Sequence, residues 1–344
     1  MKKILTDHLG IELTQRCNLN CSHCFRGEAR NVNISREIIE KVFDEVKYAR
    51  VLDLSGGEVF LAYDQLKMVL EIAKQKGVII EYCSMLTNGT IYDERIYKLL
   101  DEYFGRNYQV GISDDDFHDK SIRRIYGKNT KNSENPDLSP TSVNDIKNNI
   151  SRHLFNEHCI GFQRVSNRLI NNGRAVDLGT PHKEFEAYGY YYNNMDPRIL
   201  LAGPMIFVGA DGFISDINSD IDKRNEQSLG NINVNSISDL VINGGIEIEC
   251  KDINEFFKLM QKRLTDFGTH QGDHLGFNNG KMVHVEYVRE EEYYKALEDL
   301  PDFVDRALKA IEEDRLEEFV KTDPNFKLYP KDLSQTEHEY PDDR

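Results

Sequence analysis

Apolar residues recur at two different spacings along the first third of the chain, and the two spacings alternate. Short apolar runs, which are typical of strands, occupy residues 9–14, 51–54, 78–86 and 108–113. Apolar residues at helical spacing predict amphipathic helices near residues 38–46, 66–73 and 96–104. Ser35 stands where a helix N-cap is expected. Strand, loop and helix therefore repeat, which predicts an α/β fold with a parallel sheet and helical crossovers.

Polar or glycine-rich segments follow each predicted strand directly. A cysteine cluster follows the first strand, Gly56-Gly57-Glu58 the second and Thr87-Asn88-Gly89 the third, while Ser113 ends the fourth. The carboxyl ends of parallel strands lie at one edge of the sheet, where active sites form in such folds. We expect these segments to converge there.

The remaining two thirds of the chain have a weaker pattern. Residues 117–143 are polar and predict a long loop or lid. Residues 205–215 predict a hairpin, with Asp211-Gly212 as its turn. From residue 251 onward the pattern predicts charged helix, and the last dozen residues predict disorder.

The chain has 344 residues and a formal net charge of -16. A surface of this charge repels phosphate backbones and anionic membranes, so we expect neither nucleic acid nor membrane as a partner. No apolar run approaches the roughly 20 residues that cross a bilayer. The N-terminal residues turn polar too early for a signal peptide, so we expect a cytoplasmic location.

Three of the six cysteines, Cys17, Cys21 and Cys24, lie within eight residues. In a reducing cytosol, clustered cysteines indicate metal binding or catalysis rather than disulfides. Three thiolates on one short loop can ligate three irons of a cubane cluster and leave the fourth iron open to another ligand. The alternative is a zinc site completed by His23 or by a distant residue.

The spacing C-x-x-x-C-x-x-C, with the aromatic His23 before the third cysteine, resembles the radical SAM superfamily. The resemblance implies a partial (β/α)6 TIM-type barrel with an α-rich C-terminal extension, one [4Fe-4S] cluster and S-adenosylmethionine (SAM). It implies that the reduced cluster cleaves SAM to a 5'-deoxyadenosyl radical, which abstracts hydrogen from a substrate. It also implies a flavodoxin or ferredoxin as the electron donor.

The same resemblance assigns roles to the segments after the later strands. Gly56, Gly57 and Glu58 resemble the segment that holds the methionine end of SAM, which suits close backbone approach and a carboxylate–ammonium pair. Asn88 and Ser113 resemble further SAM contacts. The resemblance covers residues 9–175 and includes the tripeptide Gly173-Arg174-Ala175.

A second resemblance begins near residue 200. Segments 210–214 and 229–232 are similar to the start of the SPASM or twitch extension, whose cysteines hold auxiliary clusters, but residues 200–240 contain no cysteine. We therefore expect a degenerate extension without an auxiliary cluster. The predicted organisation is a radical SAM core at 1–200, the extension at 201–250, an acidic helical region at 251–332 and a disordered tail at 333–344.

The other three cysteines are most simply small buried residues. Cys159 has an alternative role as a hydrogen donor that quenches a substrate radical. For the substrate we expect a peptide, such as a precursor peptide, by analogy with proteins that carry a SPASM-like extension. A small metabolite is the alternative substrate, and a non-catalytic zinc or iron–sulfur binding protein is the alternative function.

Overall fold

The computed structural model describes a subset of the 344 residues, and every structural statement below concerns that subset. It consists of residues 2–105, 108–113, 116–126, 161–163, 174, 190–192, 198–215, 220–250, 255–256, 259–260, 274–278, 281–284 and 309.

Four parallel strands lie next to one another in chain order. They are β1 (Lys3–Thr14), β2 (Val46–Gly56), β3 (Ile79–Thr87) and β4 (Tyr108–Ile112). Each is paired in parallel with the next. The four apolar runs and the parallel sheet predicted from the sequence are confirmed, although β1 and β2 begin several residues earlier than the runs.

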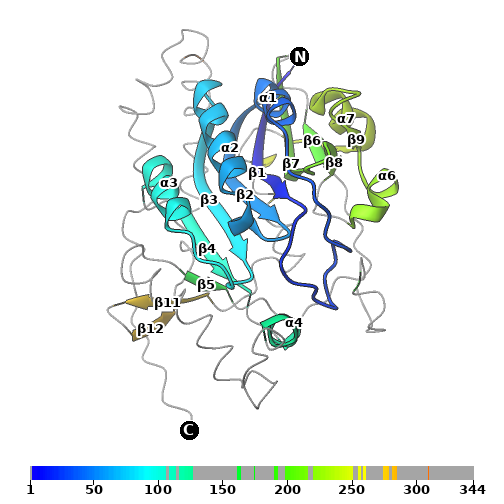
Figure 1. Cartoon of the computed structure of the whole chain (residues 1–344). Helices are drawn as coiled ribbons and strands as arrows, with labels where there is room; N and C mark the ends of the chain where they lie inside the picture. The colour runs from blue at the N-terminus through cyan, green and yellow to red at the C-terminus, as the bar shows by residue number, and fades with distance from the viewer. Residues whose placement is uncertain are drawn as a thin grey trace, which may run out of the picture.

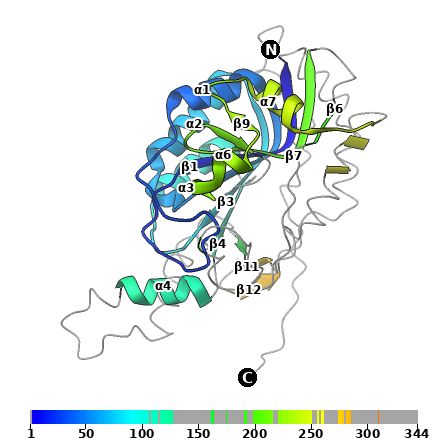
Figure 2. The ribbon, with the colours of Figure 1, turned by 90° about the vertical axis from the view of Figure 1, so that its right-hand side faces the viewer.

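Three helices cover one face of these strands, as Figure 1 and the turned view in Figure 2 show. They are α1 (Arg36–Glu45), α2 (Tyr63–Gln75) and α3 (Glu94–Phe104). Leu9, Leu52 and Cys83 lie side by side in the strand register and are fully buried in the core that the helices share. Ser35 is the N-cap of α1, as predicted, because its hydroxyl accepts from the Ile38 N–H at 3.3 Å.

The sheet continues on the other side of β1 with strands from a much later part of the chain. β7 (Ile199–Val208) pairs in parallel with β1, β6 (Tyr190–Tyr192) pairs antiparallel with β7, and β10 (Ile246–Glu247) pairs in parallel with β6. The expected boundary between residues 200 and 201 falls inside β7, within the same sheet as β1. The division into domains stays a prediction.

The predicted hairpin at residues 205–215 is confirmed. β7 turns back at Gly212 and pairs antiparallel with β8 (Phe213–Ser215), which in turn pairs with β9 (Gly230–Asn231). These strands attach to the main sheet, whose order is β10-β6-β7-β1-β2-β3-β4. Among the described strands, β4 and β10 end this order, so the closure of the predicted partial (β/α)6 barrel stays a prediction.

Three further strands form a small second sheet. They are β5 (Gly161–Gln163), β11 (His274–Asn278) and β12 (Lys281–His284), in the order β12-β11-β5. The expectation of a mostly helical region at 251–332 does not hold at β11 and β12, where backbone pairing overrides the charged helical pattern. The predicted disordered tail at 333–344 lies outside the described residues.

The extension is also bound to the core through a helix terminus. Glu45, at the end of α1, is 2 % exposed and accepts hydrogen bonds from the Ile237 and Ser238 N–H groups at 2.8 and 3.0 Å. These groups begin α7 (Ile237–Gly244), so a buried carboxylate lies at a helix N-terminus, which attracts negative charge. Residues 237–244 thus pack directly on α1.

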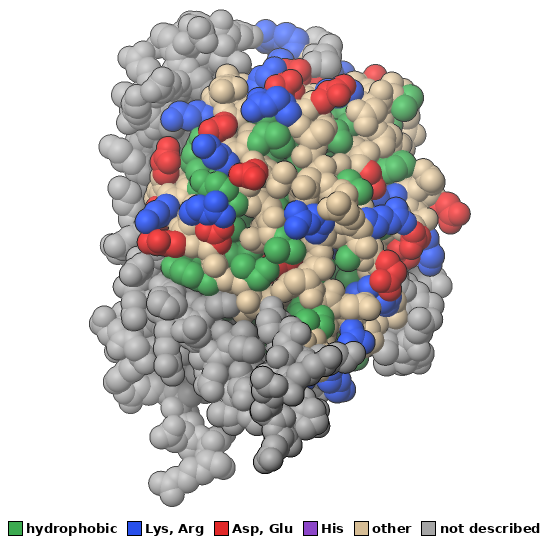
Figure 3. Space-filling model, viewed as in Figure 1, with side chains coloured by type: hydrophobic (Ala, Val, Ile, Leu, Met, Phe, Trp, Pro, Cys, Tyr) green, Lys and Arg blue, Asp and Glu red, His purple; other side chains and the backbone are tan. Residues whose placement is uncertain are grey.

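The outer surface of the three helices carries charges of both signs, interspersed with smaller apolar areas (Figure 3). Several of these charges pair within one helix at the i,i+4 spacing, such as Lys98 with Glu94 at 2.9 Å and Lys67 with Glu71 at 3.7 Å. The overall negative charge is therefore not concentrated on this face. Within the described residues, every helix is too short or too polar to cross a bilayer.

Candidate active site

The three clustered cysteines lie in a loop that leaves β1 and is closed at its base by backbone hydrogen bonds. The Gln15 N–H donates to the Val32 carbonyl at 2.8 Å, and the Arg30 N–H donates to the Gln15 carbonyl at 3.1 Å. Within the loop, the Cys24 N–H donates to the Cys21 carbonyl at 3.2 Å. These backbone hydrogen bonds define the path of the loop. We refer to residues 15–33 as the cysteine loop.

The thiols of this loop differ in environment. Cys21 is 6 % exposed, whereas Cys17 and Cys24 are half-buried. Burial raises the pKa of the Cys17 thiol to about 11, and the nearby Glu58 and Cys24 raise it further, while the Leu19 N–H opposes them. Metal coordination is what converts such a thiol into a thiolate at neutral pH.

The three thiols come from one loop. Among the described residues, no three His, Cys, Asp or Glu side chains lie close enough together to hold one metal ion. A cubane distributes its thiolate ligands over separate irons, so the ligands need one loop but not one common centre. The Leu19 N–H donates to the Cys17 sulfur at 3.4 Å, and the Asn88 amide nitrogen lies 4.0 Å from it. Such donors stabilise a cluster-bound thiolate.

Gly56 and Gly57 bring the end of β2 directly against the cysteine loop. The Gly57 N–H donates to the Thr14 carbonyl and the Glu58 N–H to the Arg16 carbonyl, both at 2.8 Å. A Cβ at Gly57 would lie 2.2 Å from the Arg16 carbonyl oxygen and 2.9 Å from the Cys17 Cβ. Only glycine allows this approach, so the structure brings together two of the predicted site segments.

Glu58 is buried, and its carboxylate joins the ends of β2 and β3. Oε1 accepts from the Thr87 hydroxyl at 2.6 Å and from the Phe60 N–H at 3.0 Å, and Oε2 accepts from the Asn88 N–H at 2.8 Å. Burial raises the pKa of Glu58, and these hydrogen bonds partly offset the rise. Glu58 also caps the short helix η1 (Val59–Leu61). Within the described residues, Oε2 keeps capacity for one more donor.

Asn88, at the end of β3, lies beside the first cysteine. Its amide nitrogen donates to the Asn18 side chain at 2.9 Å and points toward the Cys17 sulfur. Its amide oxygen accepts from the Thr90 N–H and hydroxyl at 3.0 and 2.6 Å. The predicted residue Asn88 is thus part of the hydrogen-bonded surroundings of Cys17.

The other predicted residues are distributed more widely. Ser113 is 4 % exposed, and its N–H donates to the Thr87 carbonyl at 2.9 Å, which places it one strand beyond Asn88. Cys83 is fully buried in the core, where burial raises its thiol pKa well above the usual range. Cys159 lies outside the described residues, so its role as a hydrogen donor stays a prediction.

A helix lies under the cysteine loop where the sequence predicts a long loop or lid. This helix is α4 (Asp116–Tyr126), and the expectation of a loop from residue 117 is wrong for its residues. The His23 ring stacks on Phe117 with centroids 4.7 Å apart and meets the His118 ring edge-on at 4.8 Å. Ile122 is fully buried against the loop. His23, identified from the motif, therefore packs the cysteine loop against α4.

Arg174 is a site residue that the motif analysis noted without a role. Its N–H donates to the Cys24 carbonyl at 2.9 Å, and its Nε donates to the Cys21 carbonyl at 2.8 Å. Its guanidinium also pairs with Glu28 at 3.1 Å. Arg174 therefore fixes the backbone of two of the three cysteines. The only sequence signal was its place in the tripeptide Gly173-Arg174-Ala175.

Comparison with known proteins finds chains of similar sequence. A probable GTP 3',8-cyclase of Methanococcus aeolicus is 31 % identical over 129 residues, which are 36 % of this chain and 42 % of that protein. The putative peptide biosynthesis protein YydG of Bacillus subtilis is 27 % identical over 162 residues, 43 % of this chain and 49 % of that protein. The chain thus spans less than half the length of these relatives.

Similarity to solved structures is weaker. Native anSMEcpe with bound AdoMet and Cp18Cys peptide aligns with a TM-score of 0.37 at 18 % identity, over 74 % of this chain and 83 % of that one. The family model of the radical SAM superfamily, in contrast, matches residues 11–135. That range contains the cysteine loop, Gly56 to Glu58, Asn88 and Ser113. The chain therefore contains a segment, residues 11–135, that matches the family model of the radical SAM superfamily.

Proposed function

We propose that this chain is an enzyme that binds one [4Fe-4S] cluster through Cys17, Cys21 and Cys24 and uses it to cleave SAM reductively. The observation that carries the proposal is the contact between Gly57 and the cysteine loop, where a single Cβ would collide with the Arg16 carbonyl at 2.2 Å. A glycine pair that serves only a tight turn would not need to lie on the backbone leading into the first cysteine.

In this proposal, the residues around the cysteine loop have different roles. The reduced cluster supplies the electron for cleavage of SAM. Gly56 and Gly57 allow the end of β2 to approach the backbone beside Cys17, where the methionine end of SAM would bind. Glu58 offers the remaining capacity of Oε2 to the methionine ammonium group, while its other bonds hold the ends of β2 and β3 together. Asn88 donates toward Cys17, and Ser113 provides a further SAM contact.

The cluster must be reduced from outside the chain, so the proposal includes a flavodoxin or ferredoxin as electron donor. We further propose a peptide as the substrate. The support comes from the names of two relatives, the putative peptide biosynthesis protein YydG and the subtilosin biosynthesis protein AlbA of Bacillus subtilis. AlbA is 32 % identical over 110 residues, 31 % of this chain and 23 % of that protein. The cyclase relative supports the small-molecule alternative by its name.

The first experiment tests the cluster and the cleavage of SAM. After anaerobic reconstitution with iron and sulfide, the wild-type chain should bind about four irons per chain and release 5'-deoxyadenosine from SAM under a strong reductant. Cys24→Ala should lose both properties. The control Cys83→Ala, in the core beneath the helices, should keep them. One bound zinc without sulfide would contradict the proposal and favour the binding-protein alternative.

A second experiment separates the two substrate classes. The reconstituted enzyme is incubated with SAM and either a uniformly deuterated peptide fraction or a uniformly deuterated small-molecule fraction of a cell extract. If the substrate is a peptide, 5'-deoxyadenosine should acquire deuterium only from the peptide fraction. Transfer of deuterium only from the small-molecule fraction would contradict the peptide proposal but not the proposed cleavage of SAM.

A further inference from the structure

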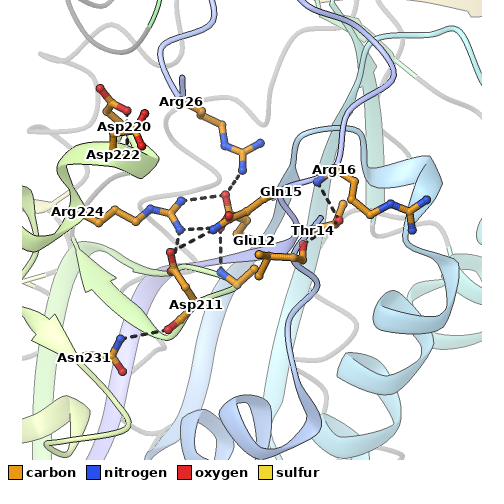
Figure 4. A network of polar contacts seen from close by, with 12 residues as sticks. Glu12, Thr14, Gln15, Arg16, Arg26, Asp211, Asp220, Asp222, Arg224 and Asn231 are labelled. Atoms are coloured by element: carbon orange, nitrogen blue, oxygen red, sulfur yellow. Dashed lines mark hydrogen bonds and ion pairs between the residues drawn. The ribbon is translucent and has the colours of Figure 1, made fainter. Parts of the chain in front are cut away.

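A buried network of ion pairs surrounds Glu12, next to the base of the cysteine loop (Figure 4). Glu12 is fully buried on β1. Its Oε1 accepts from Arg26 and, at 2.8 Å, from Arg224 Nη2. Its Oε2 accepts from Arg224 Nη1 and from the Ala210 N–H, each at 2.8 Å. One carboxylate thus joins an arginine of the cysteine loop to residues some two hundred positions later.

Asp211 completes the network from the side of the extension. Its Oδ1 pairs with Arg224 Nη1 at 2.8 Å, and its Oδ2 accepts from the Gln15 amide at 3.1 Å. Two carboxylates therefore balance two guanidinium groups. Buried charges are tolerated only when they are paired and hydrogen-bonded in this way. Removal of one member would leave its partners poorly compensated.

The same part of the extension holds the backbone that follows Cys24. The Ile221 N–H, in the short helix η4 (Ile221–Lys223), donates to the Arg26 carbonyl at 3.0 Å. Gly27 has a φ of 85°, and a Cβ there would lie 2.9 Å from the Asp220 carboxylate. Arg30 forms an ion pair with Asp222. Side-chain and backbone contacts therefore converge on the same five-residue segment.

We propose that residues 209–215 and 220–224 act as a clamp that fixes residues 26–30 and thereby sets the position of Cys24. Arg224, the first residue of α6 (Arg224–Gln227), is a positioning residue that acts through Glu12 and Arg26. The extension is then a part of the cluster-binding unit, although it supplies no ligand. The inference rests on the proposed cluster binding, because Cys24 is a ligand only in that proposal.

The test measures alkylation of individual cysteines in the metal-free protein, which reports the position of the loop whether or not a cluster binds. Wild type and Arg224→Met are treated with iodoacetamide, and modification of Cys24 and Cys83 is followed by mass spectrometry. The rate at Cys24 should rise about tenfold or more in the variant, because loss of a buried charge partner releases the loop. Cys83, fully buried on β3, should keep its wild-type rate.

Two further variants make the result specific. Arg224→Lys keeps the charge and should restore part of the protection of Cys24. Glu45→Gln weakens a different link between the extension and the core, on α1, and should leave the Cys24 rate unchanged. A wild-type rate at Cys24 in Arg224→Met would overturn the clamp.

If Arg224→Met reacts at both cysteines, Asp211→Asn decides, since it removes only one of the two carboxylate partners of Arg224 and so weakens the clamp without leaving Glu12 unpaired. Faster reaction at Cys24 alone would support the clamp, and any other pattern would overturn it. The loaded proteins provide a separate readout, because the electron paramagnetic resonance signal of the reduced cluster should shift in Arg224→Met and return in Arg224→Lys. Failure of wild type to take up iron and sulfide would contradict the proposed function rather than the clamp.

Discussion

At the scale of single residues, the site depends on close backbone contact as much as on reactive side chains. Gly57 does not have a positive φ, so glycine is required at this position because it lacks a side chain and not because of its backbone conformation. The cysteine and glycine motifs were visible in the sequence because the chemistry requires particular residue types at short spacing. The orientation of the Glu58 side chain toward the interior could not be predicted from the sequence, because its partners Thr87 and Asn88 lie at the end of a different strand.

Gly57→Ala should lose the cluster while the chain stays folded. The added Cβ displaces Arg16 and the first cysteine, so bound iron should fall to less than about half of the wild-type value. The measurement is iron and sulfide content together with the melting temperature. The control is Gly105→Ala, which has a φ of 60° and no atom within 4 Å of its Cβ position. It should lose about 1 kcal/mol of stability and keep its iron.

Glu81→Gln should change the pH dependence of stability. Burial raises the pKa of Glu81 to about 7, although Tyr48 donates to it at 2.7 Å and Arg50 also lowers it. The Glu81 carboxyl therefore keeps its proton in the folded state at a pH where the unfolded state has released it. Wild-type stability then falls as the pH rises toward and through the folded-state pKa of about 7.

The glutamine variant lacks this loss. Relative to wild type, its free energy of unfolding should be about 1–3 kcal/mol higher near pH 8 than near pH 5, so the variant gains relative stability as pH rises. Urea unfolding at the two pH values measures the difference. An equal offset at both values would show that Glu81 does not titrate in this window.

At the scale of elements, the helices that pack on the sheet were predictable and the helix that packs on the loop was not. α1 has apolar residues at helical spacing and an N-cap at Ser35, both of which are local signals. α4 is mostly polar, and its apolar contacts with the cysteine loop include those of Phe117 and Ile122. Its apolar face is completed only by residues about a hundred positions away.

Glu45→Gln should destabilise the contact between α1 and α7. Its two oxygens accept three hydrogen bonds at the start of α7, including one from the Ser238 hydroxyl at 2.7 Å. An amide would turn a donor toward these donors, which should cost about 1–3 kcal/mol of unfolding free energy. The matched control is Glu37→Gln on the same helix, where the side chain is 78 % exposed. Chemical denaturation should show a change within about 0.5 kcal/mol there.

At the scale of the whole molecule, β1 is an interior strand of the sheet although it is the first strand in the sequence. β2 lies on one side of it and β7 on the other, although their positions in the chain differ by some 150 residues. The buried Leu9 and Ile11 of β1 are opposite Ile206 and Val208 of β7, which are also buried. The core therefore needs residues beyond the boundary predicted at 200.

A chain that ends at residue 198 should not fold cooperatively. Without β7, one edge of β1 loses its backbone partners, and apolar side chains of the sheet are exposed to water. Thermal melting followed by circular dichroism should show a broad transition or none, with the full chain as reference. A sharp transition in the shortened chain would mean that residues 1–198 form a domain of their own.

The sequence by itself determined the local elements, the cysteine motif and the glycine pair, because each depends on residues within about ten positions of one another. Only the tertiary structure decided that β7 lies beside β1, that α4 lies under the cysteine loop, and that Glu12 joins Arg26 to Arg224. These contacts depend on strand register and on buried charge pairing between distant segments. Local propensity and residue spacing do not predict such pairing, since it forms only when the whole sheet is assembled.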